Sequence, residues 1–372
     1  MRIAIAGGGG FAWILAGEIT QTASSVLVLS TRVSKDDPAL PPDSVLTGTQ
    51  EHPEFEPLGA QVAVVNYSNV EELRYTLQGV DLVISTVAGQ SQLNLIDAAY
   101  RARVRTFAPS EFEGALARRP TSNDPLGRGS EAALRRLQQL SQPMSQSHVM
   151  RYTVFTCGVF YERFAPGGLA LLNISTGQSV QNSGDFLVNV GDATAEIVEL
   201  DAHGVPVVVS MTSVYDVARF VAAAIEVGPE NWPREFKMRG DQLRVRDIVG
   251  ACSSVRNSKS YRSIASNLTQ NDANQRDTVP FDLVIHEYQN IPAHLEYCVN
   301  TGNLQRWYYF QRLLATANGR YTFGRANLNE VIIASEGVDV IPERFVDWLR
   351  RVWGQTQPQV QPDFQSTAMH MD

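Results

Sequence analysis

Short hydrophobic runs alternate with amphipathic segments through the first 160 residues of the chain. Helical spacing, with apolar residues every three or four positions, marks the segments between the runs. The apolar runs cover residues 2–7, 25–32, 59–68, 80–89, 104–112 and 152–160, and the helical segments cover 11–22, 69–80, 90–104 and 129–141. Val-, Ile- and Leu-rich strands separated by helices are typical of a parallel sheet that is covered on both faces. We therefore predict an α/β fold with a doubly wound parallel sheet.

This alternation ends near residue 160. A further strand is predicted over 205–213, a helix over 214–227 and a closing amphipathic helix over 342–354, while 256–280 is polar and suits an exposed loop or short helices. We predict three parts. They are a nucleotide-binding domain over 1–160, a smaller α+β substrate-binding region over 161–354 that returns to the first domain, and a Gln- and Pro-rich disordered tail over 355–372.

Composition narrows the classes of function. The 372 residues carry a net charge of −8, so a nucleic-acid partner, which needs clustered positive charge, is not favoured. The three cysteines are far apart and the histidines have no metal-binding spacing, so we expect no metal. No apolar run is long enough to cross a bilayer, and the first strand begins at residue 2. We expect a cytoplasmic monomer or homodimer with a small-molecule substrate.

Four consecutive glycines, Gly7 to Gly10, follow the first strand and precede the first helix. A glycine-rich turn lets backbone N–H groups approach a diphosphate, and the helix N-terminus adds a positive end. The spacing G-x-G-x-x-A fits from Gly7 to Ala12, whereas the spacing G-x-x-G-x-x-G would need a glycine at Trp13. The first spacing predicts a dinucleotide site; the alternative is a tight turn that binds nothing.

The end of the second strand indicates which nucleotide would bind. An NAD site usually has an acidic residue there for the ribose hydroxyls, but this chain has Thr31 and Arg32, followed by Lys35. A guanidinium can hold a 2′-phosphate, which an acid would repel. We therefore predict NADP(H) as the cofactor, unless Arg32 is only a solvated surface charge.

Several stretches resemble the NmrA-like and isoflavone-reductase-like atypical short-chain dehydrogenases, in particular their fungal biosynthetic branch. They are "RIAIAGGGGFAW", "VLSTR", "DLVISTV", "FAPSEF", "TVFTCGVFYERF" and "VYDVARFVAAAI". The resemblance implies a Rossmann domain, a smaller C-terminal substrate domain and NADP(H) in the cleft between them.

The same resemblance implies which residues surround the cofactor. The diphosphate would lie on Gly7, Gly9, Gly10, Phe11 and Ala12, the 2′-phosphate on Thr31, Arg32 and Lys35, the adenine by Asn66 and Tyr67, the ribose by Thr86, Val87 and Ala88, and the nicotinamide by Pro109, Ser110, Glu111, Phe112, Cys157, Gly158, Val159 and Phe160. Each stretch follows a predicted strand, and doubly wound sheets bind ligands at the carboxyl ends of their strands.

The chain departs from the family at its proton-handling residue. Family reductases commonly carry a lysine in the helix after "PSEF", but Glu131 stands there, and no lysine occurs between Lys35 and Lys237. Glu131 would be a general acid or base if partly buried, and otherwise a surface residue paired with Arg135.

Two further residues are candidates for catalysis. Tyr161 would donate a proton or pack at the domain interface. Ser110 would hydrogen-bond in the site or only form a turn.

Three functions remain open on this evidence. The first is an NADPH-dependent reductase of a hydrophobic aromatic or alkaloid-like metabolite in natural-product biosynthesis. The second is a non-redox cyclase, isomerase or condensation enzyme for which the nucleotide is a helper. The third is a regulatory protein that senses NADP(H) without turnover.

Overall fold

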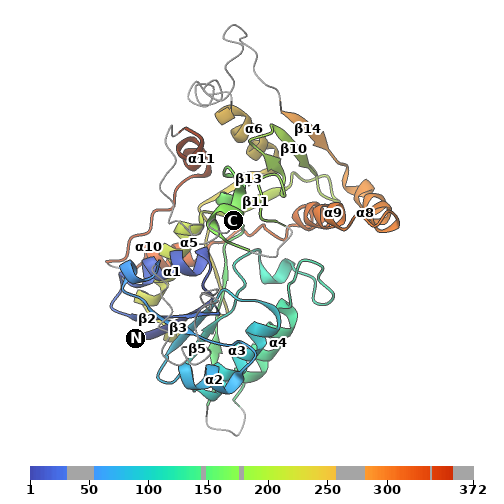
Figure 1. The fold of residues 1–372 in the computed structure, drawn as a ribbon. Helices are drawn as coiled ribbons and strands as arrows, with labels where there is room; N and C mark the ends of the chain where they lie inside the picture. The colour runs from blue at the N-terminus through green and yellow to red at the C-terminus, as the bar shows by residue number, and fades with distance from the viewer. Residues whose placement is uncertain (32–53, 144–147, 176–179, 257–280, 336, 355–372) are drawn as a thin grey trace, which may run out of the picture.

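The computed structural model describes residues 1–31, 54–143, 148–175, 180–256, 281–335 and 337–354 (Figure 1). The predicted tail and nearly all of the predicted polar loop lie outside these residues, as do Arg32 and Lys35.

A six-stranded parallel sheet forms the N-terminal half, in the order β3-β2-β1-β4-β5-β6. Its strands are β1 (Arg2–Ala6), β2 (Ser25–Ser30), β3 (Gln61–Val64), β4 (Leu82–Ser85), β5 (Thr106–Ala108) and β6 (Arg151–Tyr152). The helices between them are α1 (Gly10–Ile19), α2 (Val70–Thr76), α3 (Gly89–Arg101) and α4 (Ser130–Leu140). The strand order reverses between β1 and β4, as in a Rossmann fold, which confirms the predicted fold class.

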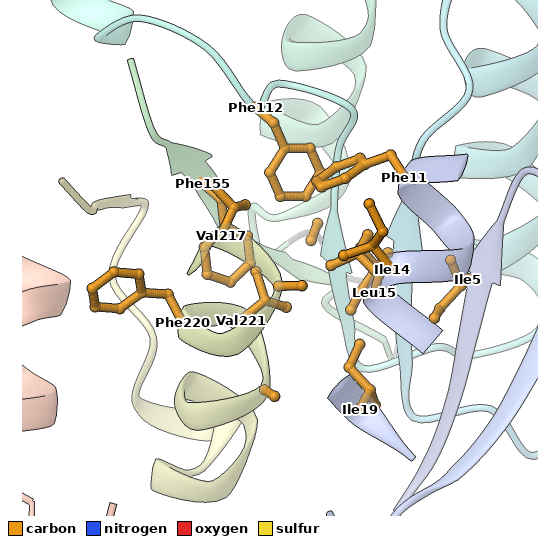
Figure 2. Packing of buried hydrophobic residues seen from close by; sticks show 14 of the residues in the cluster. Ile5, Phe11, Ile14, Leu15, Ile19, Phe112, Phe155, Val217, Phe220 and Val221 are labelled. Atoms are coloured by element: carbon orange, nitrogen blue, oxygen red, sulfur yellow. The ribbon is translucent and has the colours of Figure 1, made fainter. Parts of the chain in front are cut away.

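Alternate residues of β1 serve the two faces of the sheet. Ile3 and Ile5 pack into the core beneath α1, and Ala4 and Ala6 pack into a second core beneath α2, α3 and α4. Both faces are buried because successive strand residues point to opposite sides. Helix α5 (Val214–Val227) comes from the second half of the chain and covers α1. Figure 2 shows Phe11, Ile14 and Leu15 of α1 facing Val217 and Val221 of α5.

The predicted strand over 152–160 is three short strands. After β6, the chain forms β7 (Val154–Thr156), which pairs with β12 (Glu235–Lys237), and β8 (Val159–Phe160), which pairs with β11 (Val208–Thr212). Gly158 between them has φ +73°, and a Cβ there would lie 1.9 Å from the Ser210 carbonyl oxygen. This close approach turns the chain out of the main sheet and toward the core of the C-terminal half.

The C-terminal half builds its own core around two small sheets. Strand β13 (Asp241–Arg244) extends β8 and β11, and β9 (Val188–Asn189), β10 (Thr194–Ile197) and β14 (Asp282–Ile285) form a separate sheet. Helices α6 (Val245–Arg256), α8 (Ile291–Asn300), α9 (Leu304–Ala317) and α11 (Phe345–Gly354) surround them (Figure 1). No helix within the described ranges is long and apolar enough to span a bilayer.

Helix α10 (Asn327–Ile333) returns to the first core. The Asn327 Oδ1 accepts the Lys237 N–H at 2.6 Å, and the Asn329 Oδ1 accepts the Arg239 N–H at 3.0 Å. These bonds dock α10 beside β12, so segments from both halves of the chain interleave around α5. The domain boundary at residue 160 stays a prediction.

The buried Glu162 holds the start of α5, and the pH dependence of the protein's stability tests this contact. Its carboxylate is buried and accepts the Ser213 hydroxyl at 2.7 Å and the Val214 N–H at 2.9 Å, which holds the start of α5. Burial raises its pKa from 4.5 to about 7. The folded state therefore holds an extra proton between these values, and this stabilising contribution is lost as the pH rises through 7.

We expect the wild type to lose about 2–3 kcal/mol more unfolding free energy between pH 5 and pH 8 than Glu162→Gln, which does not titrate. Urea unfolding at both pH values measures this difference. Parallel pH profiles for the two proteins would contradict the assignment.

Candidate active site

A cavity of about 600 Å³ opens at the carboxyl ends of the central strands. It is lined by Gly7, Gly8, Gly9, Phe11, Ala12, Ser30, Thr31, Tyr67, Thr86, Val87, Ala88, Ser91, Ser110, Phe112, Arg128, Phe160, Asn173, Ile174 and Ser175. Doubly wound sheets bind their ligands at this position, beside the point where the strand order reverses.

The glycine turn closes tightly against β4. Gly7 has φ +118°, and a Cβ at this position would lie 2.2 Å from the Thr86 Oγ1. That hydroxyl is fixed because it donates to the Ala6 carbonyl at 2.7 Å. Glycine is therefore required at residue 7 for both the turn and the close approach.

Gly10 serves a contact within the protein. A Cβ there would lie 1.7 Å from the Leu172 carbonyl oxygen, and the Gly10 N–H donates to the Asn173 carbonyl at 3.3 Å. The chain after the short 3₁₀ helix Gly168–Leu172 therefore crosses directly over the start of α1. Gly10 itself is not among the lining residues.

The other backbone N–H groups at the start of α1 are available to bind an anion. Gly9, Phe11 and Ala12 line the cavity, and none of their N–H groups has a hydrogen-bond acceptor within the described part of the chain. The positive end of the helix dipole is directed to the same place. Trp13 lies away from the cavity, since its indole N–H donates to the Glu54 carbonyl at 2.7 Å.

The side of the cavity at the β2 and β3 ends contains two of the expected residues. Thr31 is exposed at its rim. Tyr67 is buried, donates its hydroxyl to the Leu29 carbonyl at 3.0 Å and has its pKa raised by burial. Asn66 is exposed and does not line the cavity; its Oδ1 accepts the Ser68 N–H.

On the opposite side, Ser110 and Phe112 line the cavity. The Ser110 N–H donates to the buried Gln92 Oε1 at 2.6 Å, which fixes the turn after β5. Phe160 lies between this cavity and an adjoining one of about 350 Å³, which Gly158 and Val159 also line.

Pro109 and Cys157 are buried outside both cavities. Burial raises the pKa of the Cys157 thiol, so it stays protonated.

A buried ionic network stabilises the "PSEF" turn, and the sequence alone did not show it. Glu111 accepts the Ser130 hydroxyl at 2.7 Å and pairs with Arg119, although burial raises the pKa of its carboxyl. Glu113 pairs with Arg119 at 2.9 Å and with Arg320 at 2.8 Å. Burial opposes ionisation of Glu113, but the two guanidinium groups outweigh it and lower its pKa.

The two other candidate catalytic residues lie outside the cavities. Glu131 is paired with Arg135, four residues along α4, and its side chain is 40% exposed. Tyr161 is fully buried and donates its hydroxyl to the Glu343 carbonyl at 3.0 Å, and its ring packs against the rings of Phe345 and Trp348. Its pKa is raised by burial. Of the three candidates, only Ser110 lines a cavity.

The position of Glu131 leads to a direct expectation. Glu131→Gln should change the melting temperature and the NADPH affinity very little, because an exposed i,i+4 ion pair contributes only about 0.3–0.5 kcal/mol. Differential scanning fluorimetry and calorimetric titration measure both effects. A tenfold loss of affinity or of NADPH oxidation would show that this carboxylate does reach the site.

No protein-family model and no curated protein sequence matches the chain significantly. Its fold does match solved structures. Pinoresinol-lariciresinol and phenylcoumaran benzylic ether reductases align over 95% of this chain and 99% of theirs, with 16% identity and a TM-score of 0.58. An isoflavone reductase aligns over 94% and 98%, with 17% identity and a TM-score of 0.57. A quinone oxidoreductase from Escherichia coli, solved with NADPH, aligns over 94% and 99%, with 14% identity and a TM-score of 0.55.

These matches establish a shared fold over nearly the whole length of each chain. The chain has the fold of these three neighbours. The E. coli neighbour is itself an NADPH-dependent enzyme, as its name states.

Proposed function

We propose that this protein binds NADP(H) and reduces a hydrophobic aromatic or alkaloid-like metabolite in natural-product biosynthesis. The observation that carries the proposal is the set of free N–H groups at the start of α1, which face a cavity at the sheet's ligand-binding edge. The fold that it shares with an NADPH-dependent quinone oxidoreductase and with reductases of aromatic metabolites supports it.

The chain's own residues would hold the nucleotide in a defined direction. The N–H groups of Gly9, Phe11 and Ala12 would bind the diphosphate, and Thr31 lies on the side expected for the 2′-phosphate. Ser110 and Phe160 lie at the opposite side, next to the adjoining cavity. The nicotinamide end would therefore be directed toward the adjoining cavity.

Bound NADPH would supply a hydride to a substrate held in the adjoining cavity. The protein would contribute proximity, exclusion of water and a proton source. Ser110 lines the first cavity and Tyr308 the second, and each carries a hydroxyl. These hydroxyls are better placed to supply the proton than Glu131 or Tyr161, which line neither cavity.

Fluorescence titration with NADPH and with NADH tests the binding step, and the fall in nicotinamide absorbance with quinone and benzylic-ether substrates tests hydride transfer. We expect tighter binding of NADPH and its oxidation by at least one aromatic acceptor. Product formation without NADPH oxidation would instead indicate a non-redox catalyst. NADP(H) binding with no conversion of any substrate would indicate a sensor.

A further inference from the structure

The residues that line the adjoining cavity carry more positive than negative charge, which is unusual for a site that binds an apolar substrate. The cavity is lined by Phe112, Glu113, Pro125, Leu126, Arg128, Gly158, Val159, Phe160, Arg163, Ser175, Val180, Phe186, Tyr308, Arg312 and Tyr321. Three of these residues are arginines, while Glu113 is the one acidic residue among them. The Glu113 carboxylate already forms salt bridges with Arg119 and Arg320.

Arg163 contributes one of the three positive charges that line this cavity. It lies in the short 3₁₀ helix Tyr161–Phe164, and its Nη1 donates to the Val180 carbonyl at 2.8 Å. No carboxylate forms a salt bridge with it anywhere in the described residues, and burial lowers its pKa to about 10. It remains charged at neutral pH, and a partly buried charge that forms no salt bridge is costly.

Two other guanidinium groups reinforce the positive field. Arg312 is 5% exposed and donates to the Asp185 carbonyl from Nε at 3.2 Å and from Nη2 at 3.0 Å. Arg128 lines both cavities and has no salt bridge within the described ranges. The positive charges of both lower the pKa of Arg163, so both guanidinium groups lie near it, and the Glu113 carboxylate offsets part of this effect.

From this arrangement we propose that the adjoining cavity takes an aromatic substrate that carries a carboxylate, with Arg163 as the residue that binds the anion. The inference rests on the proposed function, because it names the substrate class of that site. A carboxylate would supply the missing counterion and can accept two N–H groups of one guanidinium. The rings of Phe160, Phe186 and Tyr308 line the same cavity and would contact the aromatic part.

The test compares matched pairs of small probes on the protein saturated with NADP⁺. Benzoate, cinnamate and 2-naphthoate are each titrated by calorimetry beside the corresponding uncharged amide. We expect at least one carboxylate to bind about tenfold or more tightly than its amide. Arg163→Gln should abolish this preference, while Arg163→Lys, which keeps the charge, should retain part of it.

A surface arginine provides the matched control. The Arg105 side chain is 74% exposed, so Arg105→Gln should leave the preference unchanged. Circular dichroism checks that each variant is folded. The inference is overturned if NADP⁺ binds but no carboxylate binds better than its amide, or if Arg163→Gln keeps the preference. Failure of NADP⁺ itself to bind would count against the proposed function instead.

Discussion

Gly10→Ala is expected to destabilise the protein by about 3 kcal/mol or more and to weaken NADPH binding at least tenfold. The added Cβ would lie 1.7 Å from the Leu172 carbonyl oxygen, which is backbone and cannot rotate away. The crossing segment must therefore move, and it carries Asn173 and Ile174, which line the nucleotide cavity. Urea unfolding measures the stability, and calorimetric titration with NADPH measures the affinity.

Gly17 offers a matched control in the same helix. The nearest atom to a Cβ there is the Leu58 Cδ2 at 3.8 Å, which is an ordinary contact. Gly17→Ala should raise the unfolding free energy by up to about 1 kcal/mol, because alanine is the better helix former. Equal stability of the two variants would show that the segment after Leu172 does not cross the start of α1 as described.

Thr31→Asp is expected to reverse the nucleotide preference. Thr31 follows β2, is exposed and lines the cavity. NAD-binding Rossmann folds carry an acidic residue at this position. The new carboxylate would repel a 2′-phosphate and accept hydrogen bonds from free ribose hydroxyls. The affinity for NADPH should fall at least tenfold while the affinity for NADH rises, as fluorescence titration with each nucleotide would show.

Thr31→Asn separates charge from shape in this experiment. Asparagine is nearly isosteric with aspartate and is neutral, so it should change the ratio of the two affinities by only a few-fold. Because residue 31 is exposed, neither variant should alter folding. An unchanged preference in Thr31→Asp would contradict the placement of the 2′-phosphate beside this residue.

Most of the N-terminal architecture, and helix α5 as well, could be predicted from local sequence patterns. Continuous apolar runs specified the buried strands, and the helical spacing over 214–227 coincides with α5. Asn69 has a side chain that is favoured at a helix N-cap, and its Oδ1 accepts the Glu72 N–H at 3.2 Å. These features depend on neighbours in sequence, so the sequence shows them directly.

Contacts between residues that are far apart in the sequence produce no comparable sequence pattern. Gly10 looked like part of a ligand turn, but it is required by the approach of Leu172. Glu113 directly follows the "PSEF" stretch, and no local pattern shows that it pairs with Arg320, 207 residues further along the chain. The strand over 152–160 looked continuous because its apolar pattern does not reveal that Gly158 packs against β11.

The residues expected at the cofactor end line the cavity more often than those expected to act in catalysis, and the role of each stays a prediction. Glycine turns and strand ends recur at fixed places in this sheet, and most residues proposed from them line the cavity. Whether a carboxylate or phenol faces the cavity depends on tertiary packing. Glu131 was chosen because it aligns with the family lysine and Tyr161 because it carries a phenol, and neither lines a cavity, whereas Arg163 and Tyr308, which no catalytic pattern singled out, line the adjoining cavity.

A crystal structure of the protein soaked with NADP⁺ at millimolar concentration tests the central claim most directly. We expect the diphosphate on the N–H groups of Gly9, Phe11 and Ala12, with the nicotinamide beside Ser110 and Phe160. A cavity that stays free of nucleotide under these conditions, or a nucleotide bound at another place, would contradict the account.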